Sequence, residues 1–238
     1  MKKVTGSVEK TRQRANVYWF LASLIGNPID TKTLRRIADI AAVMPVDETG
    51  LAEVLHAALA GEEEEDHEVL SDRLATEHAR LFRGLRKGYG PPPPYESLWR
   101  EDRIMGDSTL AVAEAYSEAG FDDNGPWGPC DHIAYELRFM ASLCNAEAEA
   151  EQMGQPKEAD WARKRQMRFL DEHLLAWVPV YCGQLANQAE EALYRALARV
   201  TENVLTEDAK TLFGGIEGIG GERRLVSKSS PAEGAEAS

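Results

Sequence analysis

The chain has 238 residues, of which 43% are hydrophobic, so it is long enough to bury one large core or two small ones. Its 40 acidic and 27 basic residues give a formal net charge of −13, which argues against a nucleic-acid partner, because proteins that bind nucleic acids usually carry basic patches. The same charge is compatible with a basic partner, such as an arginine-bearing peptide, and equally with an ordinary acidic soluble protein.

Cysteine usage and apolar runs bear on the cellular compartment. The chain has three cysteines, Cys130, Cys144 and Cys182. Their number is odd and none of them form a CxxC sequence, so neither a disulfide framework nor a zinc site is expected. Two lysines near the N-terminus are not followed by an apolar region, so no signal peptide is expected either. The longest apolar run, residues 17–25, is short of the roughly 20 residues that span a membrane. These features predict a cytoplasmic protein without stable membrane insertion.

Helical periodicity dominates the first third of the chain. The first predicted helix has Val17, Phe20, Leu21 and Leu24 on one face and ends at a Gly-Asn-Pro sequence. Aspartates are expected to cap the second and third helices, and an acidic run at residues 62–66 precedes the fourth. The predicted helices cover residues 7–25, residues 30–43, residues 47–60 and a fourth segment that ends near residue 82.

The rest of the chain alternates helices with two loops rich in Gly and Pro, at residues 84–94 and 121–130. Asp107 and Asp131 are expected to cap helices, and Pro179 is expected to limit a helical segment. The predicted helices cover residues 95–100, 107–119, 131–152, 157–175 and 183–204. The pattern predicts an all-α, single-domain irregular helical bundle of eight or more helices over residues 1–213, followed by a disordered tail over residues 214–238.

The sequence Asp131-His132-x-x-x-Glu136 opens a long predicted helix in the second half of the chain. Ile133, Leu137 and Met140 form its buried stripe, while His132 and Glu136 lie one turn apart on another face. The pair is compatible with a general base and an orienting acid, or with half of a metal site. A structural interpretation, in which Asp131 is a helix cap, is equally consistent with the spacing.

Three weaker patterns have ordinary explanations. Cys130 next to His132 lacks a third catalytic partner. Two ExxH sequences, at residues 53–56 and 64–67, lack the further inward glutamates of a di-iron bundle. The glycine-rich residues 215–221 neither follow a strand nor open a helix, so they are expected to form a linker and not a phosphate-binding loop.

Four prolines at residues 91–94 precede an aromatic segment. Tyr95 and Trp99 are one helical turn apart, and Glu96 lies next to Tyr95. Tyrosine and tryptophan combine a large apolar area with a polar tip, which suits a groove that binds a peptide. The alternative is that the segment is a turn that packs on the core.

Four motifs, in the same order, are similar to those of the TorD/DmsD family of cytoplasmic molybdoenzyme maturation chaperones, and the resemblance covers about residues 15–205. The departures are Cys130, which stands between Pro129 and Asp131, and Gly128, where some relatives carry an acid. The motifs are a helix ending in Leu-Phe-x-Gly at residues 81–84, Pro-Pro-Tyr-Glu-Ser at 93–97, Asp-His with its helix at 131–140, and Phe-Leu-x-x-His-Leu-x-x-Trp at 169–177.

The resemblance implies a TorD-like fold without catalytic turnover. It implies a chaperone that binds the twin-arginine signal peptide or the folding core of a molybdopterin oxidoreductase catalytic-subunit precursor and delays export until the cofactor is inserted. It also implies no cofactor of its own, weak GTP binding at most, and a monomer or a domain-swapped dimer. Two alternatives stay open: a guanine-nucleotide-binding switch, although no P-loop sequence is present, and a helical metalloenzyme that uses His132 and Glu136.

A receptor for two guanidinium groups and an apolar stretch needs carboxylates beside an aromatic wall, because arginine and carboxylate form charge-assisted, often bidentate pairs. We expect His132 to hydrogen-bond the peptide backbone or to tune binding near neutral pH. The expected acids are Asp131, Glu96 and Glu136. The expected apolar wall is Tyr95, Trp99, Trp127 and Pro129.

Overall fold

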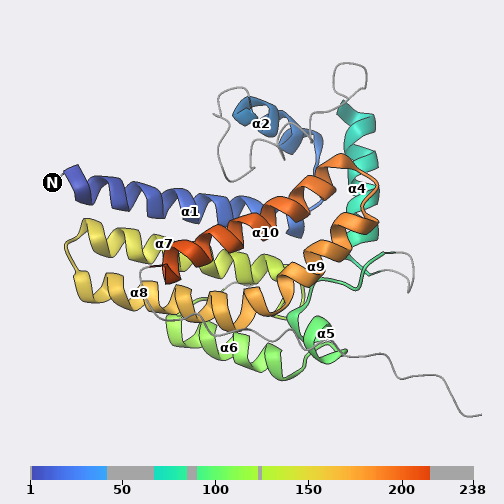
Figure 1. The fold of residues 1–238 in the computed structure, drawn as a ribbon. Coiled ribbons are helices and arrows are strands. Elements are labelled where there is room, and N and C mark those ends of the chain that lie inside the picture. The colour runs from blue at the N-terminus through green and yellow to red at the C-terminus, as the bar shows by residue number, and fades with distance from the viewer. Residues whose placement is uncertain (1, 42–66, 85–89, 123–124, 215–238) are drawn as a thin grey trace, which may run out of the picture.

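A computed structural model describes residues 2–41, 67–84, 90–122 and 125–214, and within them almost all regular structure is helical (Figure 1). The described residues contain one β-type pairing, an antiparallel bridge between Tyr95 and His132. The prediction of an all-α bundle with eight or more helices is therefore confirmed. The helices are α1 (Lys2–Gly26), α2 (Thr31–Ala41), α4 (His67–Phe82), α5 (Glu96–Glu101), α6 (Asp107–Ala119), α7 (Ile133–Gln152), α8 (Pro156–Phe169), the π-helical turn η1 (Leu170–Leu174), α9 (Leu175–Gln188) and α10 (Ala192–Phe213).

Helix α7 forms the centre of the bundle. The predicted stripe of Ile133, Leu137 and Met140 is fully buried, and neighbouring positions around the helix are buried as well. Helix α1 lies antiparallel along α7, as the contacts of Ser7 with Glu151 and of Gly26 with Trp127 show. Helix α8 turns back along α7 after the Gly-Gln-Pro break at residues 154–156 (Figure 1). A helix that is covered on several sides in this way needs apolar residues beyond a single stripe.

Most predicted boundaries agree with the structure to within a few residues, but two predicted segments lie outside the described residues. These segments are the predicted helix at 47–60 and the tail after Gly214, so neither prediction is tested. None of the described helices combines the length and apolarity that crossing a membrane requires.

The role predicted for Pro179 was wrong, because this residue lies inside α9 and does not limit it. Helices α8 and α9 run on through η1, where one turn is π-helical. Proline removes one backbone hydrogen bond and costs about 3 kcal/mol in a helix interior. The burial of Trp177, Val178 and Tyr181 around it offsets this cost, since each large apolar side chain contributes about 1.5–3 kcal/mol.

The predicted last helix over residues 183–204 was also wrong. Helix α9 continues to Gln188, and α10 begins only at Ala192. The local sequence contains neither Gly nor Pro at this break, so no local pattern marks it. Instead α4 satisfies the freed backbone groups: Arg80 donates to the Gln188 carbonyl at 2.7 Å, and the Glu77 carboxylate accepts from the Glu190 N–H at 2.7 Å.

Asp107 was predicted to cap α6. This prediction was wrong, because Asp107 is the first residue of that helix. The cap is supplied by Glu101 at the end of α5, whose carboxylate accepts from the backbone N–H groups of Asp107 at 2.8 Å and Ser108 at 2.7 Å. These hydrogen bonds lower the pKa of Glu101 to about 2, and the Ser108 side chain is their largest contributor. A tertiary contact thus replaces the local cap.

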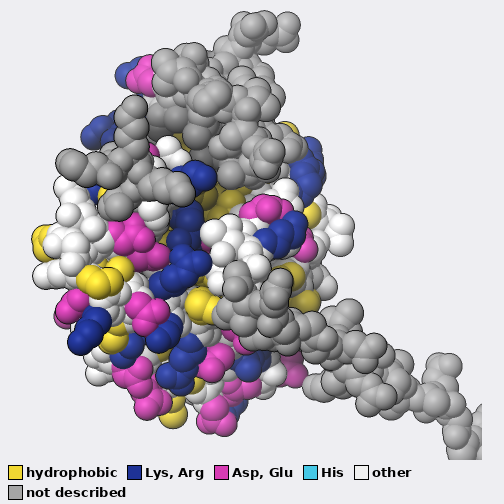
Figure 2. All heavy atoms as spheres, turned by 60° about the vertical axis from the view of Figure 1, so that its left-hand side comes forward, with side chains coloured by type: hydrophobic (Ala, Val, Ile, Leu, Met, Phe, Trp, Pro, Cys, Tyr) yellow, Lys and Arg dark blue, Asp and Glu magenta, His cyan; other side chains and the backbone are white. Residues whose placement is uncertain are grey.

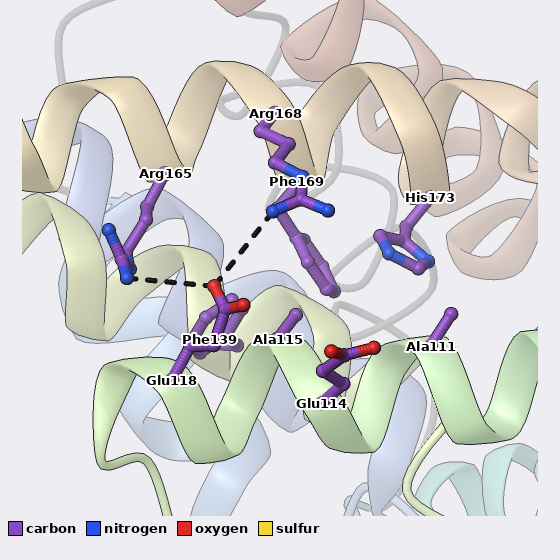
Figure 3. A pocket seen from close by; sticks show the side chains of 9 residues that line it. All are labelled: Ala111, Glu114, Ala115, Glu118, Phe139, Arg165, Arg168, Phe169 and His173. Carbon is purple, nitrogen blue, oxygen red and sulfur yellow. Dashed lines mark ion pairs between the residues drawn. The ribbon is translucent and has the colours of Figure 1, made fainter.

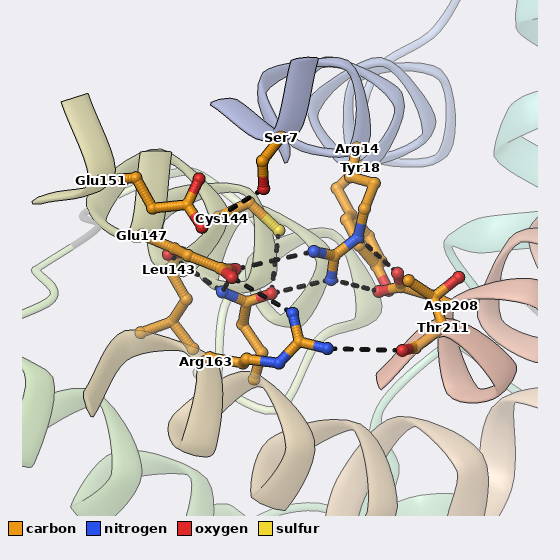
Figure 4. A network of polar contacts seen from close by, with 11 residues as sticks. Ser7, Arg14, Tyr18, Leu143, Cys144, Glu147, Glu151, Arg163, Asp208 and Thr211 are labelled. Atoms are coloured by element: carbon orange, nitrogen blue, oxygen red, sulfur yellow. Dashed lines mark hydrogen bonds and ion pairs between the residues drawn. The ribbon is translucent and has the colours of Figure 1, made fainter. Parts of the chain in front are cut away.

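A polar network joins the first and last helices to the α7–α8 pair (Figure 4). Arg14 of α1 forms a two-pronged pair with Asp208 of α10, at 2.5 and 2.9 Å, and Tyr18 donates to the same carboxylate at 2.6 Å. Gln166 of α8 accepts from Arg14 at 2.7 Å and donates to Glu147 of α7 at 2.7 Å. The network fixes α10 across α1, α7 and α8 with buried, oriented hydrogen bonds.

Candidate functional site

Two segments 37 residues apart in sequence pair at the centre of the site. The Glu96 N–H donates to the Asp131 carbonyl at 2.9 Å, and the Ile133 N–H donates to the Pro94 carbonyl at 3.0 Å. This short antiparallel contact aligns the start of α5 with the start of α7. The Pro-Pro-Tyr-Glu-Ser motif and the Asp-His motif therefore form one structural unit.

Asp131 does not cap its own helix α7, which corrects the first of the predicted roles. Its Oδ2 accepts from the Ser97 N–H at 2.9 Å and so caps the neighbouring helix α5. His132 takes the capping role for α7, because its Nδ1 accepts from the Ala134 N–H at 3.1 Å. The cap predicted for Asp131 is thus supplied by His132, while Asp131 bonds to the first turn of α5.

His132 is not suited to sense pH near neutrality, contrary to prediction. Its side chain is buried, and burial, with a smaller contribution from His78, lowers its pKa to about 3. The imidazole is therefore neutral throughout the physiological range. It packs against the aromatic rings of Tyr95, at 5.1 Å between ring centroids, and Trp127, at 6.0 Å.

Three carboxyl groups gather beneath this contact, and we call Glu96, Asp131 and Glu136 the carboxylate cluster. All three are fully buried. Glu96 pairs with Arg100 one turn along α5, and its other oxygen lies 2.8 Å from Nδ1 of His173 in η1. Three of the recognised motifs therefore meet at Glu96, which ties α5 to the π-helical turn.

Glu136 is the member of the cluster whose protonation is most strongly altered. Burial raises its pKa well above the usual value, and the adjacent carboxyl groups of Glu96 and Asp131 raise it further. The indole of Trp177 donates to its Oε2 at 3.2 Å, which opposes this rise. Burial and the neighbouring carboxyl groups together therefore favour the protonated form of Glu136.

The cluster contains buried polar atoms that have no partner among the geometric hydrogen bonds. Oδ1 of Asp131 and Oε1 of Glu136 are buried and make no hydrogen bond, and neither does the hydroxyl of Ser97. Buried polar atoms in folded proteins nearly always have a partner, so each exception needs an explanation. The site thus holds hydrogen-bonding capacity that its own residues do not use.

The predicted aromatic wall lies at the surface above the cluster. Tyr95, Trp99, Trp127 and Pro129 are all half-buried. The Tyr95 hydroxyl donates to the Trp127 carbonyl at 2.8 Å, which holds the second Gly/Pro loop against α5. Trp99 packs on another helix: its ring lies edge-on against Tyr181 of α9, with 5.3 Å between the ring centroids.

Trp127 is held by α1, which sequence reasoning did not foresee. Its indole N–H donates to the Gly26 carbonyl at 2.6 Å. The guanidinium of Arg138 lies over the Trp127 ring at 5.4 Å and over the exposed ring of Trp19 at 5.8 Å. Two indoles at this surface therefore already contact one arginine side chain, a favourable cation–π arrangement.

The site therefore brings together most of the predicted residues and adds others. Tyr95, Glu96, Asp131, His132 and Glu136 form its centre, as predicted, although the acids are sealed from solvent in this structure. The residues missed at first are Ser97, Arg138, His173 and Gly26. His173 had a signal, since it lies in the Phe-Leu-x-x-His motif, whereas nothing in the local sequence marks Gly26 or Arg138.

Comparison with known proteins identifies the family of the chain. A family model described as "Nitrate reductase delta subunit", the TorD family, matches residues 44–183, which is more than half of the chain and includes all four recognised motifs. The chain belongs to this family. Relatives named "Chaperone protein TorD" include one from Vibrio cholerae, 26% identical over 207 residues that cover 84% of this chain and 92% of the relative.

Other members of the TorD family have similar levels of identity. The TorD chaperone of Shewanella pealeana is 27% identical over 217 residues, which cover 84% of this chain and 89% of the relative. Among solved structures, a putative redox enzyme maturation protein from Archaeoglobus fulgidus matches with 24% identity, 67% coverage of this chain, 94% coverage of that chain and a TM-score of 0.39. The named relatives are chaperones, so the family is non-enzymatic.

The metal alternative concerns His132 and Glu136, both in the described part of the chain. Across that part, no three His, Cys, Asp or Glu side chains gather as metal ligands would. Nδ1 of His132 is engaged with the backbone of α7. The ExxH sequence at 53–56 and the side chains of the one at 64–67 lie outside the described residues.

A shallow cleft lies beside the site, between α6 and α8 (Figure 3). Phe139 and Phe169 line it, and Glu118 of α6 points toward Arg165 and Arg168 of α8, at 3.6 and 3.9 Å. His173 lines one end of this cleft and reaches Glu96 on its other side. The cleft is therefore linked to the carboxylate cluster through a single imidazole.

Proposed function

We propose that this protein is a cytoplasmic chaperone for a molybdopterin-containing oxidoreductase and that it binds the twin-arginine signal peptide of the precursor. Membership of the TorD family and the naming of its relatives as chaperones support the coarser part of this proposal. The chaperone retains the precursor until the molybdenum cofactor is inserted and thereby delays export. The substrate class is a polypeptide with two adjacent arginines followed by an apolar stretch.

One observation carries the finer part: a fully buried carboxylate cluster with two unpaired oxygens, on Asp131 and Glu136, below half-buried aromatic residues. A guanidinium group has five N–H donors in a planar fork that matches carboxylate geometry. An arginine that enters the cluster supplies the missing donors. The buried charge then has a partner, which makes the ion pair much stronger than an exposed one.

Entry of an arginine requires the cluster to open. In this proposal the part of the second Gly/Pro loop around Trp127 moves. It is held by two hydrogen bonds, from the Tyr95 hydroxyl to the Trp127 carbonyl and from the Trp127 indole to the Gly26 carbonyl. Displacement of this loop uncovers the carboxylates and leaves both rings free to pack on the apolar part of the peptide. Binding is therefore expected to perturb the fluorescence of Trp127.

The test is the affinity of a synthetic twin-arginine signal peptide, taken from a molybdopterin oxidoreductase of the same organism, for the full chain. Asp131→Asn keeps an oxygen for the Ser97 N–H but removes the charge, so we expect a loss of affinity of at least tenfold, as for a charge-assisted hydrogen bond worth about 1.5–3 kcal/mol. Asp107→Asn is the matched control, since the side chain of Asp107 is 91% exposed on α6.

A peptide with two lysines in place of the arginines should bind more weakly than the arginine peptide, because lysine lacks the planar fork. Equal affinities of wild-type protein and Asp131→Asn would remove the carboxylate cluster from the peptide site. Family membership would stand in that case. The client is then sought by co-purification from the host cytosol, where a molybdopterin oxidoreductase that retains its leader is the expected partner.

Cofactors and oligomeric state belong to the same proposal. We propose no resident cofactor, and GTP binding stays a prediction that isothermal titration with GTP and GDP checks. A monomer or a domain-swapped dimer is expected from the family resemblance, and light scattering coupled to size-exclusion chromatography distinguishes the two.

A further inference from the structure

A groove at the tip of the α7–α8 hairpin is unoccupied by any described segment. Its apolar part is Ala146, Ala150, Met153 and Trp161, and Met153 and Trp161 are 69% and 40% exposed. Large exposed apolar side chains that share a hollow mark an interaction surface more often than scattered ones do. One face of Trp161 is already covered, because the guanidinium of Arg165 lies 3.9 Å from the ring centroid.

The polar rim of this groove is mainly acidic. Glu149 of α7 and Glu158 of α8 line it and are exposed, and Lys157 is the single base among the lining residues. Figure 2 shows the side of the molecule on which this hairpin tip lies, with acidic and basic side chains interspersed with apolar ones. An occupant that carries positive charge next to apolar side chains therefore fits the groove.

The chain itself provides such a segment beyond α10. Residues 222–228 read Glu-Arg-Arg-Leu-Val-Ser-Lys and carry a net charge of +2, whereas the other residues after Gly214 include no arginine or lysine. Within this stretch the two arginines immediately precede the two apolar residues Leu225 and Val226. The segment thus matches the groove in both charge and apolar content.

The segment is also within reach. Arg163 of α8 donates to the carbonyl of Thr211 in the last turn of α10, at 3.4 Å, so the tail leaves the bundle beside α8. Trp161 lies two residues from Arg163 on the same helix, about half a turn around it. Nine residues separate Gly214 from Arg223 and span up to about 30 Å. Passing around a helix about 10–12 Å wide requires less than this.

We propose that Arg223, Arg224, Leu225 and Val226 dock into the groove at the tip of the α7–α8 hairpin of the same molecule. The arginines pair with Glu149 and Glu158, and the two apolar side chains cover Met153 and Trp161. Docking removes the largest exposed apolar surface of the hairpin from solvent and keeps an arginine-rich segment of the chaperone away from its peptide site.

The direct test is photo-crosslinking within the full chain. A benzophenone amino acid replaces Leu225, and mass spectrometry maps the crosslinked peptides. We expect crosslinks to residues 146–161, at a yield independent of protein concentration. Crosslinks mainly to residues 91–100 or 125–136 would instead indicate that the tail occupies the peptide site, and crosslinks between differently labelled molecules would indicate a second copy. Either result, or no specific crosslink, would overturn the proposal.

A charge swap tests the chemistry of the contact. Glu149→Lys with Glu158→Lys should lower the crosslink yield at least fivefold, and adding Arg223→Glu with Arg224→Glu should restore most of it. The matched control is Glu114→Lys with Glu202→Lys, two exposed glutamates on α6 and α10, which should leave the yield unchanged. An equal loss in the control would show that net charge alone governs the tail. Circular dichroism verifies that each variant is folded, and the readout requires no client peptide.

Discussion

At the scale of single residues, the site depends on side chains whose protonation and packing differ from their ordinary behaviour in water. Burial, and after it the nearby Glu96 carboxyl group, raise the pKa of Glu136. Gly26 provides both a carbonyl for the Trp127 indole and the space that its ring occupies. Each property leads to a measurable consequence.

Replacing Glu136 by glutamine should change how stability depends on pH. A raised folded-state pKa means that the contribution of Glu136 is fully present below its ordinary pKa of 4.5 and is lost as pH rises toward the folded-state value. Glutamine retains an oxygen for the Trp177 indole but does not titrate. Relative to wild type, the variant should therefore gain up to about 1.4 kcal/mol per pH unit above pH ~4.5. Urea unfolding at several pH values checks this.

The exposed Glu114 of α6 serves as the control for this measurement, because Glu114→Gln should leave the pH profile unchanged. A Glu136→Gln variant that differs from wild type by the same amount at pH 4 and pH 7 would contradict a raised pKa of Glu136.

Gly26→Ala should displace the Trp127 ring. A Cβ at this position would lie 2.6 Å from two ring carbons of Trp127, closer than real side chains approach. We expect a loss of about 1–3 kcal/mol in the free energy of unfolding, as for other overpacked sites, and a shift in tryptophan emission. Gly183→Ala is the control in α9, since nothing lies within 4 Å of its added Cβ, and should stabilise the protein by about 0.5–1 kcal/mol.

At the scale of helices, the bundle is held at its corners by side chains that reach between distant segments. Helix α4 ends in the Leu-Phe-x-Gly motif, and two of its polar residues bond to the corner between α9 and α10. Glu77 also binds Arg80 through both carboxylate oxygens at 2.8 Å. The motif therefore marks a structural joint in addition to a helix end.

Glu77→Ala should weaken this joint strongly. The substitution removes the carboxylate that pairs with the partly buried Arg80 guanidinium and leaves the Glu190 N–H without its acceptor, which we expect to cost about 2–3 kcal/mol. Asp72→Ala, at an exposed position of the same helix, should change stability by less than about 0.5 kcal/mol. Similar effects of the two substitutions in urea unfolding would show that the corner does not depend on Glu77.

At the scale of the whole molecule, the network around Arg14 and Asp208 joins the ends of the described chain (Figure 4). The two residues are 194 positions apart in sequence, so this contact forms only when the bundle closes. It fixes the last helix, and with it the point from which the C-terminal segment leaves the molecule.

Asp208→Ala should loosen α10 as a unit. It leaves Arg14 and the Tyr18 hydroxyl without their shared acceptor in a buried environment, and removal of one partner of a buried pair typically costs about 3–5 kcal/mol. Hydrogen exchange of α10 should accelerate more than that of α7. The adjacent Glu207→Ala removes only an exposed pair with Lys210 and should have little effect; a comparable loss there would contradict the role of the network.

Sequence alone determined the class of the fold and the motifs that the fold brings together. Helical periodicity, together with Gly and Pro between the periodic segments, is a local property, so most helices and both described loops were predicted. The four motifs that carry the family resemblance also identified Tyr95, Glu96, Asp131, His132 and Glu136 as residues of one site.

Only the tertiary structure decided what these residues do. Asp131 caps α5 and not α7, because backbone pairing with the Tyr95 segment directs its carboxylate toward the Ser97 N–H. The break before α10 has no local signal and depends on bonds from α4. The raised pKa of Glu136 likewise follows from burial beside Glu96, which spacing along one helix cannot reveal. Caps, breaks and pKa values of this kind arise from contacts between distant segments, and these exist only after the chain has folded.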